Sequence, residues 1–145
     1  MDDELHDIAT NLHSVSIRML RTLRREDEGI GLSQPRLSAL SVIVFAGPMS
    51  LAELAAAEQV KPPTMSRIVE ALVADRLVTR VAVPEDRRSV RIAATEKGRR
   101  LMEAGRERRV RALSERLVGL AQSERRALAR GVELLERIMR MPTGD

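Results

Sequence analysis

The sequence predicts a mainly α-helical protein that carries one small β-hairpin. Apolar residues recur at helical spacing over most of the 145 residues. Two short segments, 77–83 and 89–94, alternate instead with the period of two that is typical of β-strands. Two short predicted helices, 50–60 and 61–72, come directly before this hairpin. This order of elements predicts a winged helix-turn-helix, with long helices on either side of it.

The first predicted helix runs from Asp3 to about Glu28, and Gly29 and Gly31 end it. One face carries a continuous apolar stripe made of Leu5, Ile8, Leu12, Val15, Ile17, Met19, Leu20 and Leu23. Nothing within the segment covers this stripe. The helix therefore has to pack against another long helix, in the same chain or in a second copy.

The second predicted helix spans residues 34–46, with Ser33 as its N-cap. Its buried side is expected to hold Leu37, Leu40, Ile43 and Val44. The side chains of Gln34 and Arg36 stand at the helix start, where a backbone phosphate could be held. An ordinary solvated turn is the alternative interpretation.

A helix-turn-helix is predicted for the segment that follows. Ser50 and Glu53 form the S-x-x-E pattern of a capping box at the start of its first helix. Pro62 and Pro63 favour the start of its second helix, because a proline there has no N–H to leave unpaired. This second helix is anchored by one apolar face, made of Met65, Ile68, Val69 and Leu72.

The opposite side of that second helix carries the groups that are expected to contact DNA. Small hydrogen-bonding side chains and an arginine at a helix start suit base edges in a major groove. The candidate residues are Lys61, Pro63, Thr64, Ser66 and Arg67. Lys61 is a candidate phosphate contact, and a solvated loop lysine is the alternative.

In the hairpin, the polar segment Pro84–Arg88 is predicted to be the loop between the strands. The apolar residues of both strands are expected on one face. Arg80 and Arg91 are expected on the other face, as phosphate contacts.

These segments resemble the MarR (multiple antibiotic resistance regulator) family of bacterial transcription factors. The similarity rests on the helix-turn-helix together with DRLVTR (75–80), PEDRRSVRI (84–92) and TEKGRRL (95–101), and it covers nearly the whole chain. The chain departs from the family pattern at Arg76, where glycine is common, and at Ala94, where leucine is common. Arg76 implies a helix end without its favoured left-handed glycine, at a cost of roughly 1 kcal/mol.

The resemblance implies that an arginine of the hairpin tip enters the minor groove, where narrow A·T-rich stretches concentrate negative potential. Arg88 is the first candidate and Arg87 the second. Asp86 is expected to hold the Arg88 guanidinium by a bidentate pair, because an acid facing DNA would otherwise repel phosphate. Solubilising charges on a hairpin tip are the alternative.

The apolar faces of the first and the last helices suit a dimer interface, and the resemblance likewise implies a homodimer. Residues 32–95 would form the winged helix-turn-helix DNA-binding domain, and residues 1–30 and 96–141 the helical dimerisation region. Thr95 is expected to cap a helix that runs to about Leu120, and Ser123 to start the last helix. Pro142 and Gly144 are expected to end the ordered chain.

The resemblance further implies a small phenolic or anionic effector, bound in a cleft between the two regions. The residues expected to line this cleft are His13, Ile17, Leu40, Val44 and Met102. The predicted function is a sequence-specific, double-stranded DNA-binding transcriptional regulator that acts as a homodimeric repressor on a pseudo-palindromic operator. The alternative is a winged-helix protein-interaction module without specific DNA binding.

Composition argues against other classes of function. There is no cysteine, no glycine-rich phosphate loop and no metal-ligand spacing, so neither an enzyme nor a cofactor is expected. His6 and His13 lie about 10 Å apart along a helix, too far for one metal ion. Phe45 is the single aromatic residue, which argues against stacking on single-stranded nucleic acid. An acidic N-terminus without a long apolar run predicts a cytoplasmic protein that does not enter membranes.

Overall fold

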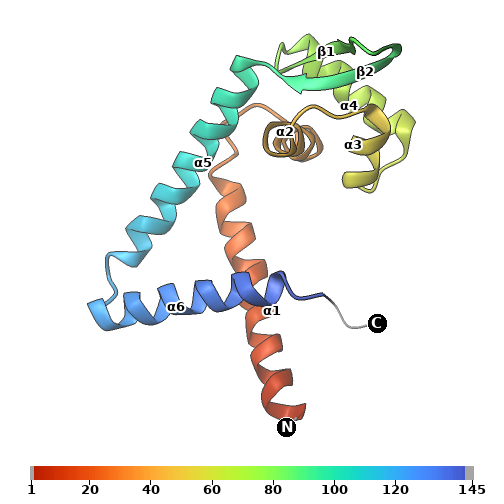
Figure 1. The fold of residues 1–145 in the computed structure, drawn as a ribbon. Coiled ribbons are helices and arrows are strands. Elements are labelled where there is room, and N and C mark those ends of the chain that lie inside the picture. The colour runs from red at the N-terminus through yellow and green to blue at the C-terminus, as the bar shows by residue number, and fades with distance from the viewer. Residues whose placement is uncertain (1, 143–145) are drawn as a thin grey trace. The chain divides into compact units, whose positions relative to one another are not determined.

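The computed structural model describes residues 2–142, except for the side chains of Asp2 and Arg87. This part of the chain is mainly helical and carries one antiparallel hairpin, which confirms the predicted fold class (Figure 1). Gly144 lies outside the described residues. The elements are α1 (Asp2–Arg25), α2 (Gln34–Ala46), α3 (Leu51–Ala57), α4 (Pro62–Ala74), β1 (Val78–Val83), β2 (Asp86–Ala94), α5 (Glu96–Leu117) and α6 (Gln122–Met139).

The chain divides into two compact units, with the boundary between Arg109 and Val110 inside α5. The first unit contains α1 to β2 and most of α5, and the second contains the end of α5 and α6. The predicted functional division, residues 32–95 against 1–30 and 96–141, stays a prediction. No helix among residues 2–142 has the length and apolarity needed to cross a membrane.

The core of the first unit lies where α2, α3, α4 and the hairpin meet (Figure 1). Its largest fully buried side chains are Leu40, Ile43, Leu54, Met65, Val69, Leu72 and Val78. Ala39 is buried as well, whereas Val44, predicted to be buried, is only half-buried. The sequence misplaces this position because α2 is apolar on nearly every side, so its periodicity does not select one face.

The start of α3 has the predicted capping box. The Glu53 backbone N–H donates to the Ser50 hydroxyl over 3.1 Å, and the Ser50 N–H donates to the Glu53 carboxylate over 2.7 Å. Ser33 occupies the N-cap of α2, but its side chain makes no capping hydrogen bond. The last helix begins one residue before the predicted Ser123, because Ala121 is its N-cap residue.

The ends of α3 and α4 both close with a residue in the left-handed region. Gln59 follows α3 with φ of 54°, and Arg76 follows α4 with φ of 60°. Arg76 donates its backbone N–H to the Val73 carbonyl, and the next residue, Leu77, donates to the Leu72 carbonyl, each over 2.9 Å. This is the Schellman arrangement, which usually has glycine at the left-handed position. The predicted helix end without a left-handed glycine is confirmed, because Arg76 takes that position.

The hairpin, called the wing from here on, turns at Pro84 and Glu85, a shorter loop than predicted. The register slips by three residues next to the turn, so 87–89 form a bulge in β2. Further along, Arg80 lies opposite Ile92 and Val81 lies opposite Arg91. Opposite residues project to the same face of a sheet. Arg80 and Arg91 therefore lie on different faces, and the prediction of a shared face is wrong.

Residues 95–98, at the start of α5, contact the residues that directly follow α4. The Thr95 hydroxyl lies 2.7 Å from the Arg76 carbonyl oxygen and accepts the Gly98 backbone N–H over 3.1 Å, so Thr95 caps α5 as predicted. The Lys97 ammonium donates to the Asp75 carbonyl over 2.9 Å. A Cβ atom on Gly98 would overlap the Leu77 carbonyl oxygen. Backbone carbonyls at the end of α4 are thus tied directly to α5.

Candidate nucleic-acid interface

The predicted DNA contacts on α4 lie opposite its buried face. Met65, Val69 and Leu72 are buried in the core. Lys61, Pro63, Thr64 and Arg67 are exposed, and Ser66 is half-buried. The structure therefore brings these five residues to one accessible end of the helix.

The start of α4 offers few backbone donors. Pro62 and Pro63 remove two of the N–H groups that a helix start normally leaves free. The backbone N–H groups of Thr64 and Met65 both donate to the Lys61 carbonyl, over 3.0 and 3.1 Å. This end of α4 therefore offers a partner mainly side chains rather than backbone donors.

Asp86 organises the bulge of the wing instead of pairing with a guanidinium. Its carboxylate accepts the Ser89 hydroxyl over 2.7 Å and the Arg88 backbone N–H over 3.0 Å. These hydrogen bonds, first from Ser89 and then from Arg88, lower the pKa of Asp86 below its usual value. The predicted bidentate pair with the Arg88 side chain is wrong, because the short Asp side chain bonds locally to the turn.

Arg88 is exposed next to the tip of the wing, and none of the ion pairs found among residues 2–142 involves it. The Arg87 side chain, the second predicted minor-groove candidate, lies outside the description. Arg88 is therefore the tip arginine that the structure shows accessible to a nucleic acid.

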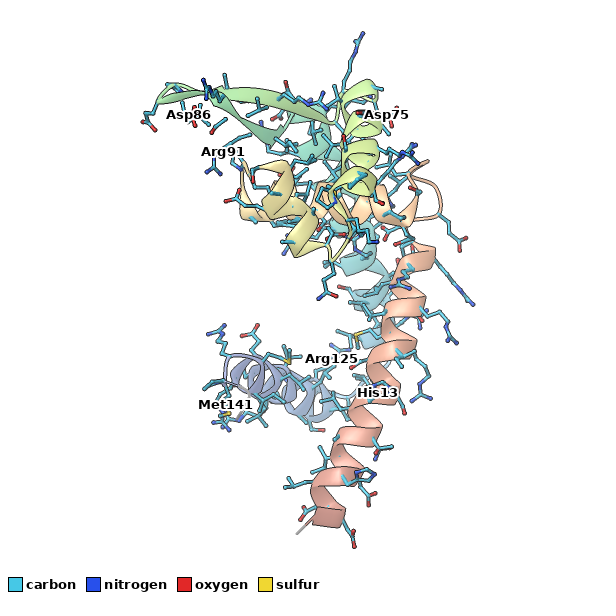
Figure 2. The ribbon with its side chains drawn as sticks, turned by 90° about the vertical axis from the view of Figure 1, so that its right-hand side faces the viewer. His13, Asp75, Asp86, Arg91, Arg125 and Met141 are labelled. Atoms are coloured by element: carbon cyan, nitrogen blue, oxygen red, sulfur yellow. The ribbon has the colours of Figure 1, made fainter. Side chains whose placement is uncertain are left out.

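Arg91 connects the wing to the helix-turn-helix. Its side chain is labelled in Figure 2. The guanidinium donates to the Pro48 carbonyl over 3.1 Å and lies 3.5 Å from the Glu53 carboxylate. Hydrogen bonds from the Ser50 N–H and side chain, together with the charge of Arg91, lower the pKa of Glu53. Arg91 thus holds two parts of the domain together, although its side chain remains about half exposed.

Arg80 lies on the face of the wing that carries the buried Ile92. The sequence predicted it on the opposite face. Arg80 lines a small cavity of about 230 Å³ together with Leu51, Val69, Val90 and Ile92. Arg80 itself is exposed. Arg80 and Arg91 thus lie on different faces of the wing, and their roles as phosphate contacts stay predictions.

The five residues predicted to line an effector cleft are not brought together. Leu40 and Met102 belong to the hydrophobic core, and Val44 lies half-buried at its edge. His13 and Ile17 are exposed on α1, and Figure 2 shows His13 midway along that helix. These positions were expected from the cleft that the resemblance implies between the first, second and fifth helices; of the five, Met102 lines the cavity beside α2 and α5.

A different cavity, of about 210 Å³, lies beside α2 and α5. Its lining residues are Asp27, Gln34, Leu37, Ser38, Ser41, Met102 and Arg109. Asp27 and Arg109 form an ion pair of 2.5 Å in which the Asp27 side chain is only 8% exposed. Gln34, predicted as a phosphate contact, lies here, and Arg36 lies 3.9 Å from Asp75. The contact between Asp27 and Arg109 joins residues 82 positions apart, so it has no local signal in the sequence.

Glu70 is not among the residues predicted from the sequence, yet it is exposed on the accessible side of α4. The Ser66 hydroxyl donates to its carboxylate over 3.3 Å. The spacing from Arg67 would have indicated its position, because residues three apart share a helix face.

No group of three or more His, Cys, Asp or Glu residues in the described part of the chain could hold a metal ion.

Comparison with known proteins agrees with this architecture. Residues 32–90 match the MarR family. An uncharacterized HTH-type transcriptional regulator of Mycobacterium bovis is 34% identical over 128 residues, covering 88% of this chain and 90% of the relative.

Two solved structures share the fold. A MarR family protein from Bacillus stearothermophilus superposes with a TM-score of 0.82 at 22% identity, covering 97% of this chain and 99% of the other. A variant of MepR from Staphylococcus aureus, bound to an oligodeoxyribonucleotide, has a TM-score of 0.69 at 18% identity, over 92% of this chain and 98% of the other. With the family match and a regulator related over most of its length, this chain belongs to the MarR family of winged helix-turn-helix, DNA-binding transcriptional regulators.

Proposed function

We propose that the protein is a homodimeric repressor that binds a pseudo-palindromic operator in double-stranded DNA. The observation that carries this proposal is the accessible end of α4, where Lys61, Thr64 and Arg67 are exposed opposite a fully buried face. A helix held by its back in this way presents its polar side chains to the base edges of a major groove. A dimer bound across promoter DNA would exclude RNA polymerase sterically, and this is the mode of repression that we propose.

The wing supplies the second contact. Arg88 is exposed beside a tip whose shape is held by Asp86. An exposed guanidinium carried beside a hairpin tip suits the narrow minor groove next to the major groove that α4 would enter. Charge-based contacts of this kind make the affinity fall steeply with salt concentration.

Exposed apolar residues support the homodimer. On α1 the exposed large apolar side chains are Leu5, Ile8, Val15, Ile17, Met19 and Leu20, and on α6 they are Leu128, Val132, Leu134, Leu135, Ile138 and Met139. Apolar surface of this extent is typical of a protein–protein interface. Two-fold symmetry would then place the half-sites about one helical turn apart.

The cavity beside α2 and α5 is the best candidate for an effector site. Its volume of about 210 Å³ suits a one-ring molecule. Asp27 already neutralises Arg109, so an anion would gain little there. Ser38, Ser41 and Gln34 supply hydrogen-bonding groups beside the apolar Leu37 and Met102. These features favour a neutral phenolic effector over an anionic one.

The test is fluorescence anisotropy of the full chain on a labelled duplex from its own upstream region, over a series of salt concentrations. Arg88→Ala is expected to lower the affinity by roughly tenfold or more, because it removes the groove contact of the wing. Arg106→Ala removes the same charge from an exposed position on α5 and serves as the matched control.

Equal loss in both variants would contradict the role of the wing. Binding of the wild-type chain that is equally weak for operator and scrambled duplexes, followed by failure to enrich any sequence from genomic DNA, would instead favour the protein-interaction module.

A further inference from the structure

Glu70 stands in the middle of the outward face of α4. Residues 63, 67, 70 and 74 follow one another at helical spacing on the side opposite Met65, Val69 and Leu72, and all four are exposed. An acid therefore lies on the same surface as Arg67. A carboxylate at this place weakens the attraction to phosphate. Its presence needs a reason other than general affinity.

The local contacts give Glu70 a defined direction. The Ser66 hydroxyl donates to Glu70 Oε1 over 3.3 Å, one helical turn away. Among the ion pairs found for residues 2–142, none neutralises Glu70. The carboxylate is thus a charged hydrogen-bond acceptor, held along the helix and open toward the surface.

The edges of the bases differ in what they offer such an acceptor. Cytosine presents the N4 amino group, a donor, in the major groove. Guanine presents two acceptors, and adenine places the N7 acceptor beside its amino group, where it would repel a carboxylate. Thymine offers an acceptor and a methyl group. A fixed carboxylate therefore selects cytosine.

We propose that Glu70 is a specificity-determining residue that accepts a hydrogen bond from a cytosine amino group, and that Ser66 is its positioning residue. This inference rests on the proposed binding of α4 in a major groove. Arg67 carries the donor fork that suits guanine. The Cα atoms of residues 67 and 70 are about 4.5 Å apart along the helix axis, close to the spacing of about 3.4 Å between base pairs. The two side chains would read neighbouring base pairs.

The experiment is selection from a randomised duplex library with the full-length wild-type chain, Glu70→Gln and Glu103→Gln. Glutamine pairs with adenine through N6 and N7. Glu70→Gln is therefore expected to replace one cytosine in each half-site by adenine, with the preference for cytosine over adenine falling by about tenfold or more. Glu103→Gln makes the same charge change at an exposed site on α5 and should keep the cytosine.

Ser66→Ala provides an independent measurement. Cytosine should stay preferred, but its discrimination should fall by roughly threefold, because a carboxylate without its hydrogen bond is less well directed. An unchanged discrimination would overturn the positioning role of Ser66.

Two further outcomes distinguish a failure of the role of Glu70 from a failure of the proposed DNA binding. If the wild-type chain enriches a defined site and Glu70→Gln enriches the same site at every position, the role of Glu70 is wrong while DNA recognition stands. If the wild-type chain enriches no sequence, the proposed function fails and the role of Glu70 fails with it.

Discussion

Arg76 shows how one residue sets the exit from the recognition helix. Its φ of 60° closes the Schellman arrangement after α4, and Thr95 from the next segment lies 2.7 Å from its carbonyl oxygen. A side chain with a Cβ atom is strained in this region, whereas glycine is not. The position of the backbone is kept by hydrogen bonds from both sides, so the strain is tolerated.

Arg76→Gly is expected to raise the free energy of unfolding by about 1 kcal/mol, because relief of the left-handed strain exceeds the extra entropy of glycine in the unfolded chain. Urea denaturation followed by circular dichroism measures it. Arg76→Ala removes the same side chain but keeps the Cβ atom, so it should bring no gain. A comparable gain in both variants would mean that the arginine side chain, not the backbone strain, is unfavourable.

Glu53 makes the start of α3 sensitive to acid. The hydrogen bonds from Ser50 hold the pKa of Glu53 below its usual value of 4.5. A carboxyl whose pKa is lower in the folded state stabilises the fold above its unfolded pKa, and this stabilisation is lost as the pH falls through the folded pKa. Glu53→Gln keeps a capping oxygen but does not titrate. The wild-type chain should melt at a higher temperature than Glu53→Gln at pH 7, and this difference should narrow at a pH below 4.5, as the pH falls through the lowered pKa of Glu53. A difference that is the same at both pH values would exclude this role.

At the scale of elements, the start of α5 packs directly against residues 75–77, the segment that follows α4. Lys97, Thr95 and Gly98 all meet backbone carbonyls at the end of α4. Because the neighbour of Gly98 is a carbonyl rather than a flexible side chain, α5 cannot shift here without moving the end of the recognition helix.

Gly98→Ala is expected to lower the free energy of unfolding by roughly 1–3 kcal/mol, through overpacking against the Leu77 carbonyl. Gly105→Ala is the matched control in the same helix, where a Cβ atom would lie 3.4 Å or more from its nearest neighbours. That variant should be neutral or gain about 0.5 kcal/mol from higher helix propensity. Equal behaviour of the two variants in thermal melting would show that the joint is not close-packed.

At the scale of the whole molecule, the proposed homodimer accounts for the apolar surface that the single chain leaves exposed. Val132 on α6 is 48% exposed, so a charge placed there does not disturb the described core. Val132→Glu is expected to shift the mass from two chains to one in light scattering. It should also reduce operator affinity by about tenfold or more, because two linked half-site contacts become one. Gln122→Glu adds the same charge at the start of α6 and should remain dimeric. A dimeric Val132→Glu would place the interface elsewhere.

The sequence by itself determined the helices and strands, the capping box at Ser50 and the strained helix end at Arg76. These features depend on residues within about five positions of one another, so their signals are local. The same is true of the accessible end of α4, because helical periodicity places Met65 and Val69 on a different face from Thr64 and Arg67.

Only the tertiary structure decided which side chains meet across the fold. The three-residue slip in the wing put Arg80 and Arg91 on different faces, and Asp86 bonded to the turn instead of to Arg88. The ion pair between Asp27 and Arg109, at the edge of the cavity beside α2 and α5, joins distant segments. The physical reason is that register and long-range packing are set by the sum of many weak contacts, and no short stretch of residues encodes that sum.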